Sequence, residues 1–296
     1  MRILVSGASG LIGRALMASF RGDGLSPIRL VRSQADGRSA ILWDPGSRRF
    51  DTSAANGADV VVHLAGENIA SGRWTAKRRR AIRESREVGT RLICEGLATM
   101  DPRPSVLVSA SATGFYGSRG DEELDEQSSS GSGFLAEVCR TWEAATEPAA
   151  RAGIRVVNLR FGVVLDKGGG ALAKMLPIFR LGLGGRVGDG AQWMSWVTLE
   201  DCVRAIRHAV DQPISGAVNA VAPVPVRNRD FATALGRHLG RPTLFPAPAV
   251  ALRLALGQMA DETLLASSRV IPQRLTDAGF AFRSPTIDEG LRAALG

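Results

Sequence analysis

Short apolar runs alternate with helical repeats along the first half of the chain. In the helical segments, apolar side chains such as Ile12, Leu16 and Phe20 recur at the spacing of one helix face. The predicted strands cover residues 3–7, 28–31, 60–64, 106–109 and 154–159, and the predicted helices cover residues 11–20, 77–97 and 134–147. Such alternation is typical of βαβ units, whose parallel sheet is covered on both faces. We therefore predict an α/β protein with a doubly wound parallel sheet.

The pattern changes after about residue 165. Glycine-rich loops at residues 168–170 and 182–190 are followed by five prolines between residues 223 and 248. We expect the chain to return to the sheet around residues 196–222. The prediction is a larger domain and a smaller C-terminal substrate lobe. The larger domain comprises residues 1–165 and 196–222, and the lobe comprises residues 166–195 and 223–296.

A glycine motif separates the first predicted strand from the first predicted helix. Its sequence, Gly7-Ala8-Ser9-Gly10-Leu11-Ile12-Gly13, has the form G-x-x-G-x-x-G. Missing side chains allow a tight turn, close approach of a pyrophosphate and close packing of helix on strand, and the helix N-terminus attracts phosphate. We therefore predict a Rossmann-type dinucleotide site formed by Gly7, Ser9, Gly10, Leu11, Ile12 and Gly13.

The end of the second predicted strand indicates which dinucleotide binds. NAD-selective sites usually carry an acid there for the ribose hydroxyls, but this strand ends in Arg32 and Ser33, with no acid before Asp36. A guanidinium pairs well with a 2′-phosphate, and a hydroxyl adds a further donor. The sequence favours NADP, and an exposed loop arginine is the alternative interpretation of Arg32.

Composition and charge narrow the classes of function. The 296 residues are 45% hydrophobic and 22% charged, with a mean hydropathy of +0.02, as in ordinary globular proteins. No apolar stretch is long enough to span a membrane and no signal peptide is visible, so we expect a cytoplasmic protein without a membrane partner. Three scattered cysteines and three scattered histidines predict neither a disulfide framework nor a metal site.

The formal net charge of +8 is concentrated in one predicted helix. Residues 73–91 hold eight basic residues and two acidic ones. A solvated helix face is the favoured interpretation of this run. A site for an anionic ligand is the second interpretation, and nucleic acid is a weaker alternative because no aromatic platform accompanies the charges.

The chain resembles the extended short-chain dehydrogenase/reductase group, the NAD-dependent epimerase/dehydratase superfamily. Within it, the chain is similar to an atypical "epimerase family" branch that has its own C-terminal extension and is sometimes labelled cell-division inhibitor. The matching segments are residues 7–13, 63–67, 73–91, 109–117, 134–143, 159–165, 188–196, 200–201, 269–272 and 279–282.

The resemblance implies further site residues. It places Leu64, Ala65, Gly66 and Glu67 beside the cofactor, and residues 160–163, beginning with Arg160, where backbone approaches the nicotinamide. Ser109 and Ser111 match the end of the strand that carries the group's substrate-polarising serine. The alternative role for each serine is a hydroxyl that caps a turn. Residues 192–196 would line the substrate cleft, or their indoles would pack the lobe.

The chain departs from the group at its acid–base pair. The group's Tyr-x-x-x-Lys spacing places both side chains on one helix face, but the matching positions here are Phe134 and Val138. The single tyrosine, Tyr116, is followed four residues later by Gly120. Tyr116 is the candidate substitute proton donor beside Ser111, with a structural Tyr-Gly turn as the alternative. The carboxylates of Glu67 and Glu137 are further candidates.

Two hypotheses follow for function. The first is an NADP(H)-dependent oxidoreductase or epimerase-like enzyme that acts on a small molecule with Ser111 and a nonstandard acid. The second is a non-catalytic NADP(H) sensor, because the nucleotide motif is intact while the usual acid–base pair is missing. A homodimer is an open alternative to a monomer for either hypothesis.

Overall fold

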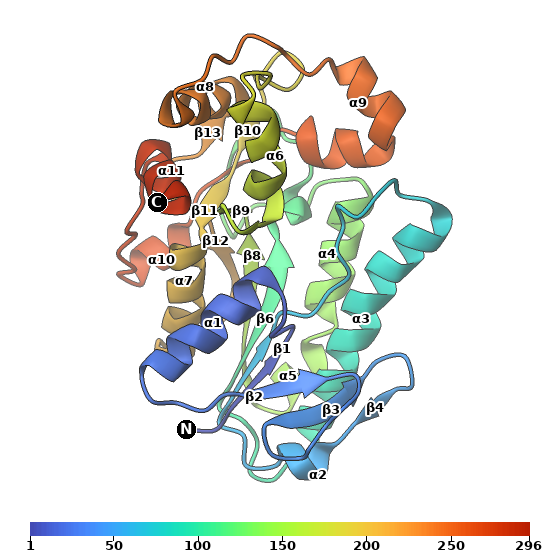
Figure 1. Cartoon of the computed structure of the whole chain (residues 1–296). Helices are drawn as coiled ribbons and strands as arrows, with labels where there is room; N and C mark the ends of the chain where they lie inside the picture. Colours follow the sequence, from blue (N-terminus) through green and yellow to red (C-terminus); the bar gives the residue numbers. More distant parts are fainter.

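One large sheet dominates the computed structural model, which describes residues 1–296 (Figure 1). Its strands, in spatial order, are β12 (Gly216–Ala220), β8 (Arg155–Phe161), β6 (Val106–Ala112), β5 (Val60–His63), β1 (Ile3–Ser6), β2 (Ile28–Val31), β3 (Ala40–Asp44) and β4 (Arg49–Phe50). All neighbours run parallel except β3 and β4. The predicted doubly wound α/β fold is confirmed.

Helices cover both faces of this sheet, as Figure 1 shows. On one face lie α1 (Leu11–Gly22) and α7 (Leu199–Asp211), and on the other lie α2 (Thr52–Ala55), α3 (Ala76–Ala98), α4 (Phe134–Ala144) and α5 (Glu147–Arg151). Successive strand side chains point to opposite faces, so Val5 joins the core under α1 whereas Leu4 joins the core under α3. Strands buried on both sides therefore need the continuous apolar runs that the sequence shows.

The order in which the strands join the sheet reverses beside β1. From β1 the chain moves outward through β2 to β3, whereas β5, β6, β8 and β12 follow on the other side of β1. The chain leaves the carboxyl ends of β1 and β5 toward opposite faces of the sheet, and we call the space outside these two strand ends the crevice. Doubly wound sheets bind their ligands at this position.

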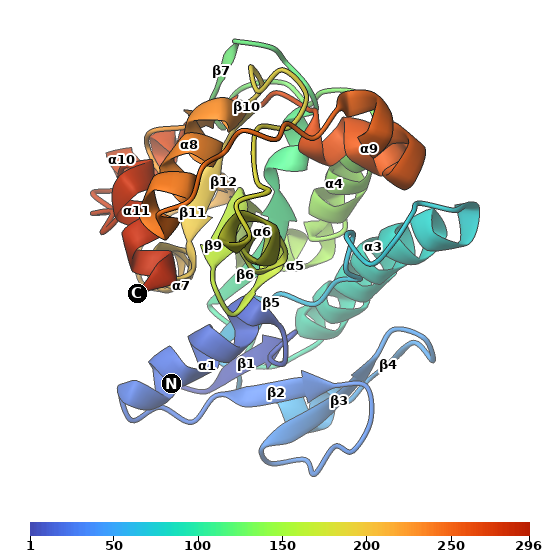
Figure 2. The same cartoon turned by 45° about the horizontal axis from the view of Figure 1, so that its top comes forward.

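Most of the remaining elements gather above the carboxyl edge of the large sheet, as the two views show (Figures 1 and 2). Three short strand pairs form there: β9 (Val163–Asp166) with β11 (Trp196–Thr198), β10 (Trp193–Met194) with β13 (Val226–Arg227), and β7 (Glu123–Leu124) with β14 (Arg269–Val270). The helical elements are α6 (Gly170–Arg180), α8 (Asn228–Leu239), α9 (Ala249–Leu256), α10 (Gln273–Asp277), α11 (Ile287–Leu295) and the single turns η1 (Thr113–Tyr116) and η2 (Ala260–Leu264). No helix has the length and hydropathy of a bilayer-spanning segment.

Several elements differ from the sequence prediction. Strand β3 and helix α6 were not predicted, and the predicted helix 134–147 ends at Ala144 before α5 begins. Only β12 of the region 196–222 joins the large sheet, because β11 pairs with β9 instead. Leu275 and Phe280 pack into the core between the large sheet and α1. The two-domain division remains a prediction.

Candidate functional site

The loop after β1 has no room for side chains at two of its glycines. Gly7 has φ +67°, and a Cβ there would lie 2.7 Å from the carbonyl carbon of Leu64 and 2.8 Å from the nitrogen of Ala65. A Cβ on Gly13 would overlap the carbonyl oxygen of Gly7. The glycines therefore let the β1 loop touch the β5 loop and let α1 start directly against the turn.

Helix α1 presents its N-terminus to the crevice. Gly10 is the N-cap residue, and neither a capping side chain nor an acid in the first turn neutralises the helix end. Ser9 and Gly10 are exposed, whereas Gly13 is buried. Free N–H groups and the helix dipole together favour an anion at this position. The arrangement fits a pyrophosphate, which needs close backbone approach.

A buried polar chain fixes the β5 loop against β1. The backbone nitrogens of Leu64 and Ala65 donate to Ser6 Oγ at 3.1 and 3.3 Å, so the Ser6 hydroxyl donates to His63 Nδ1 at 2.6 Å. His63 Nε2 is then the protonated nitrogen and lies 3.0 Å from Thr90 Oγ1 on α3. Burial lowers the pKa of His63 to about 3, which keeps the ring neutral. Apart from a serine and a histidine at the ends of apolar strands, nothing in the sequence pattern indicates this series of hydrogen bonds.

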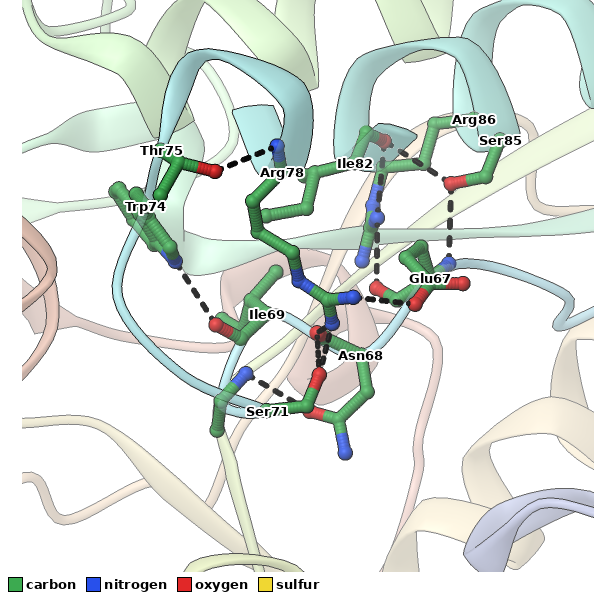
Figure 3. Close-up of polar contacts among 11 residues, drawn as sticks. Glu67, Asn68, Ile69, Ser71, Trp74, Thr75, Arg78, Ile82, Ser85 and Arg86 are labelled. Atoms are coloured by element: carbon green, nitrogen blue, oxygen red, sulfur yellow. Dashed lines mark hydrogen bonds and ion pairs between the residues drawn. The ribbon is translucent and has the colours of Figure 1, made fainter. Parts of the chain in front are cut away.

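Side chains of α3 hold the continuation of the β5 loop (Figure 3). Glu67 pairs with Arg78 at 2.7 Å, and its backbone nitrogen donates to Ser85 Oγ at 3.0 Å. Arg86 donates to the Glu67 carbonyl at 3.0 Å and stacks over the Trp142 ring of α4 at 4.8 Å. The predicted cofactor segment Leu64, Ala65, Gly66 and Glu67 is thus fixed between β1 and α3.

Arg32 and Ser33 follow β2 and are both exposed. Neither Arg32 nor Ser33 is engaged in an ion pair or side-chain hydrogen bond. The nearby Asp36 is engaged, because its carboxylate accepts hydrogen bonds from the Ser39 hydroxyl and from the backbone of its own loop. These bonds, led by the one from Ser39, hold the pKa of Asp36 well below its usual range. Arg32 therefore forms no ion pair and lies where the adenine-side ribose of a dinucleotide would lie.

Ser111 belongs to a buried ion-pair network across β6, β8 and α4. Its hydroxyl donates to Glu143 Oε1 at 2.6 Å, and Arg160 donates from Nε and Nη2 to both Glu143 oxygens, each at 2.8 Å. The Arg160 guanidinium also lies 3.5 Å from the centre of the Phe115 ring. Burial acts to lower the pKa of Arg160, but the bonds and charge of Glu143 outweigh it and raise the pKa. Glu143 was not predicted from the sequence.

Tyr116 lies at the far end of the same network. Its hydroxyl accepts from Arg160 Nη1 at 2.9 Å and donates to Asn219 Oδ1 at 2.7 Å. The side chain is fully buried, and this burial raises the pKa of Tyr116 to about 12, against the opposing charge of Arg160. Ser109 is also buried, in register with His63, and its hydroxyl makes only a long contact of 3.5 Å with the Ala110 carbonyl. The structure thus gathers Ser111, Tyr116 and Arg160 but leaves Ser109 outside the network.

The N-terminal half of α4 is apolar where it meets α3. Phe134 and Val138 are buried in a cluster with Trp74, Ile82 and Met259. Burial also raises the pKa of the neighbouring Cys139 thiol to about 12, so this cysteine is a packed, unreactive side chain. Glu137 is half exposed and pairs with Arg83 at 2.8 Å.

The two tryptophans of segment 192–196 have different surroundings. Trp196 is fully buried beneath α11, where its ring contacts Gly290, so it packs the lobe and does not line a cleft. Trp193 is stacked between Arg227 and Arg269, with ring-to-guanidinium distances of 4.4 and 5.2 Å.

One large cavity lies away from the crevice. It is open, measures about 850 Å³, and lies between α1, α7 and the segment around Phe280. Its cations are already paired, Arg204 with Asp201 at 2.7 Å and Arg207 with Asp23. Arg283, which also lines this cavity, pairs with Glu200, so the cavity offers no unpaired arginine to an anionic nucleotide. We therefore place the candidate site at the crevice between the β1 and β5 loops.

Residues 3–222 match the model of the "NAD dependent epimerase/dehydratase family". The chain belongs to this family. Residues 247–294 match a second model, described as "Domain of unknown function (DUF1731)". The resemblance to the atypical branch of extended short-chain dehydrogenases/reductases is thereby confirmed, including its C-terminal extension.

Relatives in this epimerase/dehydratase family match over nearly their whole length. Epimerase family protein Mb2239 of Mycobacterium bovis is 45% identical over 290 residues, which cover 98% of this chain and 96% of that protein. The human epimerase family protein SDR39U1 is 33% identical over 296 residues, covering 99% of each. A crystal structure of human SDR39U1 (isoform 2) with NADPH matches with a TM-score of 0.91 and 31% identity, over 99% of both chains.

Proposed function

We propose that the crevice between the β1 and β5 loops binds NADP(H). Two neighbouring features carry this proposal: the close contact of Gly7 with Leu64 and Ala65, and the uncapped N-terminus of α1. A dinucleotide pyrophosphate requires both of them. The NADPH in the similar human structure supports it. In this proposal, backbone of residues 9–13 cradles the pyrophosphate. Residues 64–67 flank the ribose, while Ser109 and Arg160 mark the strand ends on the nicotinamide side.

Arg32 and Ser33 select NADP over NAD in this proposal. Both side chains are exposed and unpaired at the end of β2, so they meet a 2′-phosphate without breaking other bonds. The Asp36 carboxylate is occupied by its own loop and does not accept from ribose hydroxyls. The charge-assisted hydrogen bond of Arg32 therefore decides the nucleotide.

The reaction we propose is an oxidoreductase or epimerase-like conversion of a small molecule between the sheet and the C-terminal lobe. The nicotinamide, when bound, supplies the hydride chemistry. The positions that match the usual tyrosine and lysine carry Phe134 and Val138 in an apolar cluster, so the proton must come from elsewhere. We propose Ser111 as the group that polarises substrate. Tyr116 acts as a positioning residue, since its buried hydroxyl is bonded to Arg160 and Asn219.

Ser111 must change its hydrogen bond for this role. Its proton is donated to Glu143, so the hydroxyl as it stands can accept a hydrogen bond from a substrate but cannot donate one to it. Turnover of NADPH with a panel of aldehydes, ketones and sugar nucleotides, followed by nicotinamide absorbance, tests the proposal. We expect Ser111→Ala to lower kcat about 100-fold with unchanged NADPH affinity. Equal turnover by Ser111→Ala and the unmodified chain would remove Ser111 from the reaction.

A second candidate function is a non-catalytic NADP(H) sensor. The observation that favours it is the saturation of both candidate hydroxyls, Ser111 on Glu143 and Tyr116 on Asn219. A sensor would bind NADPH tightly and oxidise none of it with any member of the panel. Hydride transfer to one substrate class, stoichiometric with nicotinamide oxidised, would exclude the sensor.

A further inference from the structure

The positive charge of the molecule comes from three stretches that contain no acidic residue. Residues 68–83, 167–188 and 231–260 hold 13 of the 37 lysines and arginines and none of the 29 aspartates and glutamates. The rest of the chain therefore has 24 basic and 29 acidic residues, a formal charge of −5, although the whole chain is +8. We call the surface formed by these three stretches the basic cap.

The three stretches meet at one end of the molecule. Lys174 of α6 donates to the Ala70 carbonyl at 2.9 Å, which joins the second stretch to the first. Arg79 donates to Gln258 at 3.1 Å, which joins the first to the third. Arg241 donates to the Arg180 carbonyl at 2.8 Å and closes the set. Figures 1 and 2 show α6, α9 and the N-terminal end of α3 together beyond the carboxyl edge of the sheet.

The basic cap also exposes most of the large apolar side chains on the surface. Nine large apolar residues are exposed in the whole molecule, and seven of them belong to the cap. Their side chains are 53–77% exposed: Ile178, Leu181, Leu183, Leu244, Phe245, Val250 and Leu254. Helix α9 buries none of its residues, and Val250 and Leu254 are one turn apart on the same side of it. Exposed apolar groups gathered in this way mark an interaction surface.

Most cations of the basic cap have no acidic partner. Four of them form ion pairs, namely Arg78, Arg83, Arg237 and Arg253. Lys167 donates to the backbone oxygens of Leu295 and Gly296 at the C-terminus. The other eight cations form no ion pair: Arg73, Lys77, Arg79, Arg80, Lys174, Arg180, Arg186 and Arg241. The surface thus combines uncovered leucine and phenylalanine side chains with unneutralised positive charge.

We propose that the basic cap docks on the surface of a bilayer rich in anionic lipids. Proteins that bind peripherally to such a bilayer combine cations with exposed leucine and phenylalanine side chains. The apolar side chains insert among the acyl chains, and the cations contact the headgroups. The proposal replaces our expectation of no membrane partner, which rested only on the absence of a spanning segment. It is independent of the nucleotide site.

Charge and shape argue against two other occupants. A second copy of the chain related by two-fold symmetry would bring the same unpaired cations against themselves. Nucleic acid would use the charges, but it would leave Leu181, Leu244 and Leu254 without a partner, and Phe245 is the only exposed aromatic side chain among the seven.

The test is co-sedimentation of the full chain with vesicles of phosphatidylcholine alone and of an equal mixture with phosphatidylserine. We expect binding only to the mixture, weakened by salt. Lys77→Ala/Arg80→Ala should weaken it roughly 30-fold, at about 1 kcal/mol for each cation near an anionic bilayer. Arg21→Ala/Arg29→Ala is the matched control, because both arginines are exposed and unpaired at the other end of the molecule. It should change binding less than twofold.

Leu181→Ser/Leu254→Ser tests the apolar part, and should lower binding at least tenfold while the thermal unfolding temperature is unchanged. Failure of the unmodified chain to sediment with the anionic vesicles at low salt would overturn the proposal. So would equal losses in the cationic variant and its control. If the chain forms a concentration-dependent dimer that the leucine variant abolishes, the cap binds a second copy of the chain. If the chain binds RNA but no vesicles, and the leucine variant still binds RNA, the cap binds nucleic acid.

Discussion

Gly10 and Gly13 lack side chains for different physical reasons, and variants separate the two. A Cβ on Gly13 overlaps the backbone of the turn, whereas a Cβ on Gly10 has only the Gly7 carbonyl oxygen nearby, at 3.3 Å. We predict that Gly10→Val folds with a loss of no more than about 1 kcal/mol of unfolding free energy, because valine is a poorer N-cap residue than glycine, but binds NADPH at least 100-fold more weakly, since its side chain covers the end of α1. Gly13→Val should lose about 3 kcal/mol or more of unfolding free energy. Calorimetric titration and thermal unfolding measure both effects. Tight NADPH binding by Gly10→Val would contradict the placement of the pyrophosphate.

Glu143 offers a comparison between a buried and an exposed ion pair. Its side chain and that of Arg160 are 14% and 5% exposed, whereas those of Glu147 and Arg151 are 58% and 76% exposed. We predict that Glu143→Ala costs about 3–5 kcal/mol of unfolding free energy, because it leaves Arg160 buried without its counterion. Glu147→Ala should cost less than about 0.5 kcal/mol. Urea unfolding measures both, and similar losses would show that the buried network is not held by this pair.

His63 makes stability depend on pH in a defined window. Its pKa is depressed by burial from 6.5 to about 3, so between these values the unfolded chain binds a proton that the folded chain does not. The contribution of neutral His63 to stability is fully present above about pH 6.5 and is lost progressively as the pH falls toward 3. The loss of unfolding free energy that comes from His63 is about 2 kcal/mol at pH 5. We predict that His63→Gln loses less unfolding free energy between pH 7 and pH 5 than the unmodified chain does. An identical loss in both would contradict a neutral buried ring.

At the level of single residues, the sequence predicted the polar groups but not their partners. Ser111 and Tyr116 were identified as candidates, yet Glu143 lies 32 residues from Ser111, and Asn219 lies 103 residues from Tyr116. The packing of α4 against β6 brings Glu143 to Ser111. The pairing of β6 with β8 and of β8 with β12 brings Asn219 to Tyr116. The roles of Arg32 and Ser33 remain predictions, because their proposed partner is a ligand.

Elements with strong periodicity were predicted well, and those with mixed signals were not. The strands β1, β5, β6 and β8 are buried on both faces, and their continuous apolar runs show it. Strand β3 was not predicted, although residues 40–43 form a short apolar run, because the run follows a long polar loop and no predicted helix precedes it. Helix α6 was missed because it starts at Gly170 and contains Pro177, two residues that usually indicate a break. Its buried side chains Leu172, Leu176 and Phe179 nevertheless follow helical spacing.

The whole molecule combines the proposed nucleotide crevice with a basic cap at the same edge of the sheet. The sequence could predict the position of the crevice, because its glycine motif is local and directly precedes a helix. The cap could not, since its three stretches are far apart in the chain and only the fold joins them. The basic run 73–91 was visible, but the exposed leucines of α9 and of the loops after α6 and α8 were needed to interpret it.

The most direct test of the account is the affinity of the nucleotide-free chain for NADPH, NADP⁺, NADH and NAD⁺, measured by calorimetry. We predict tight binding of NADPH and NADP⁺, the two nucleotides that carry a 2′-phosphate. Arg32→Ala should weaken NADPH binding about 10- to 100-fold, as expected for a hydrogen bond between charged groups, and leave NADH binding unchanged. Arg29→Ala is the matched control, because Arg29 is an exposed arginine on β2, three residues before Arg32. It should not change the affinity for any of the four nucleotides. Equal affinity for all four nucleotides, or no binding, would contradict the proposed NADP(H) site.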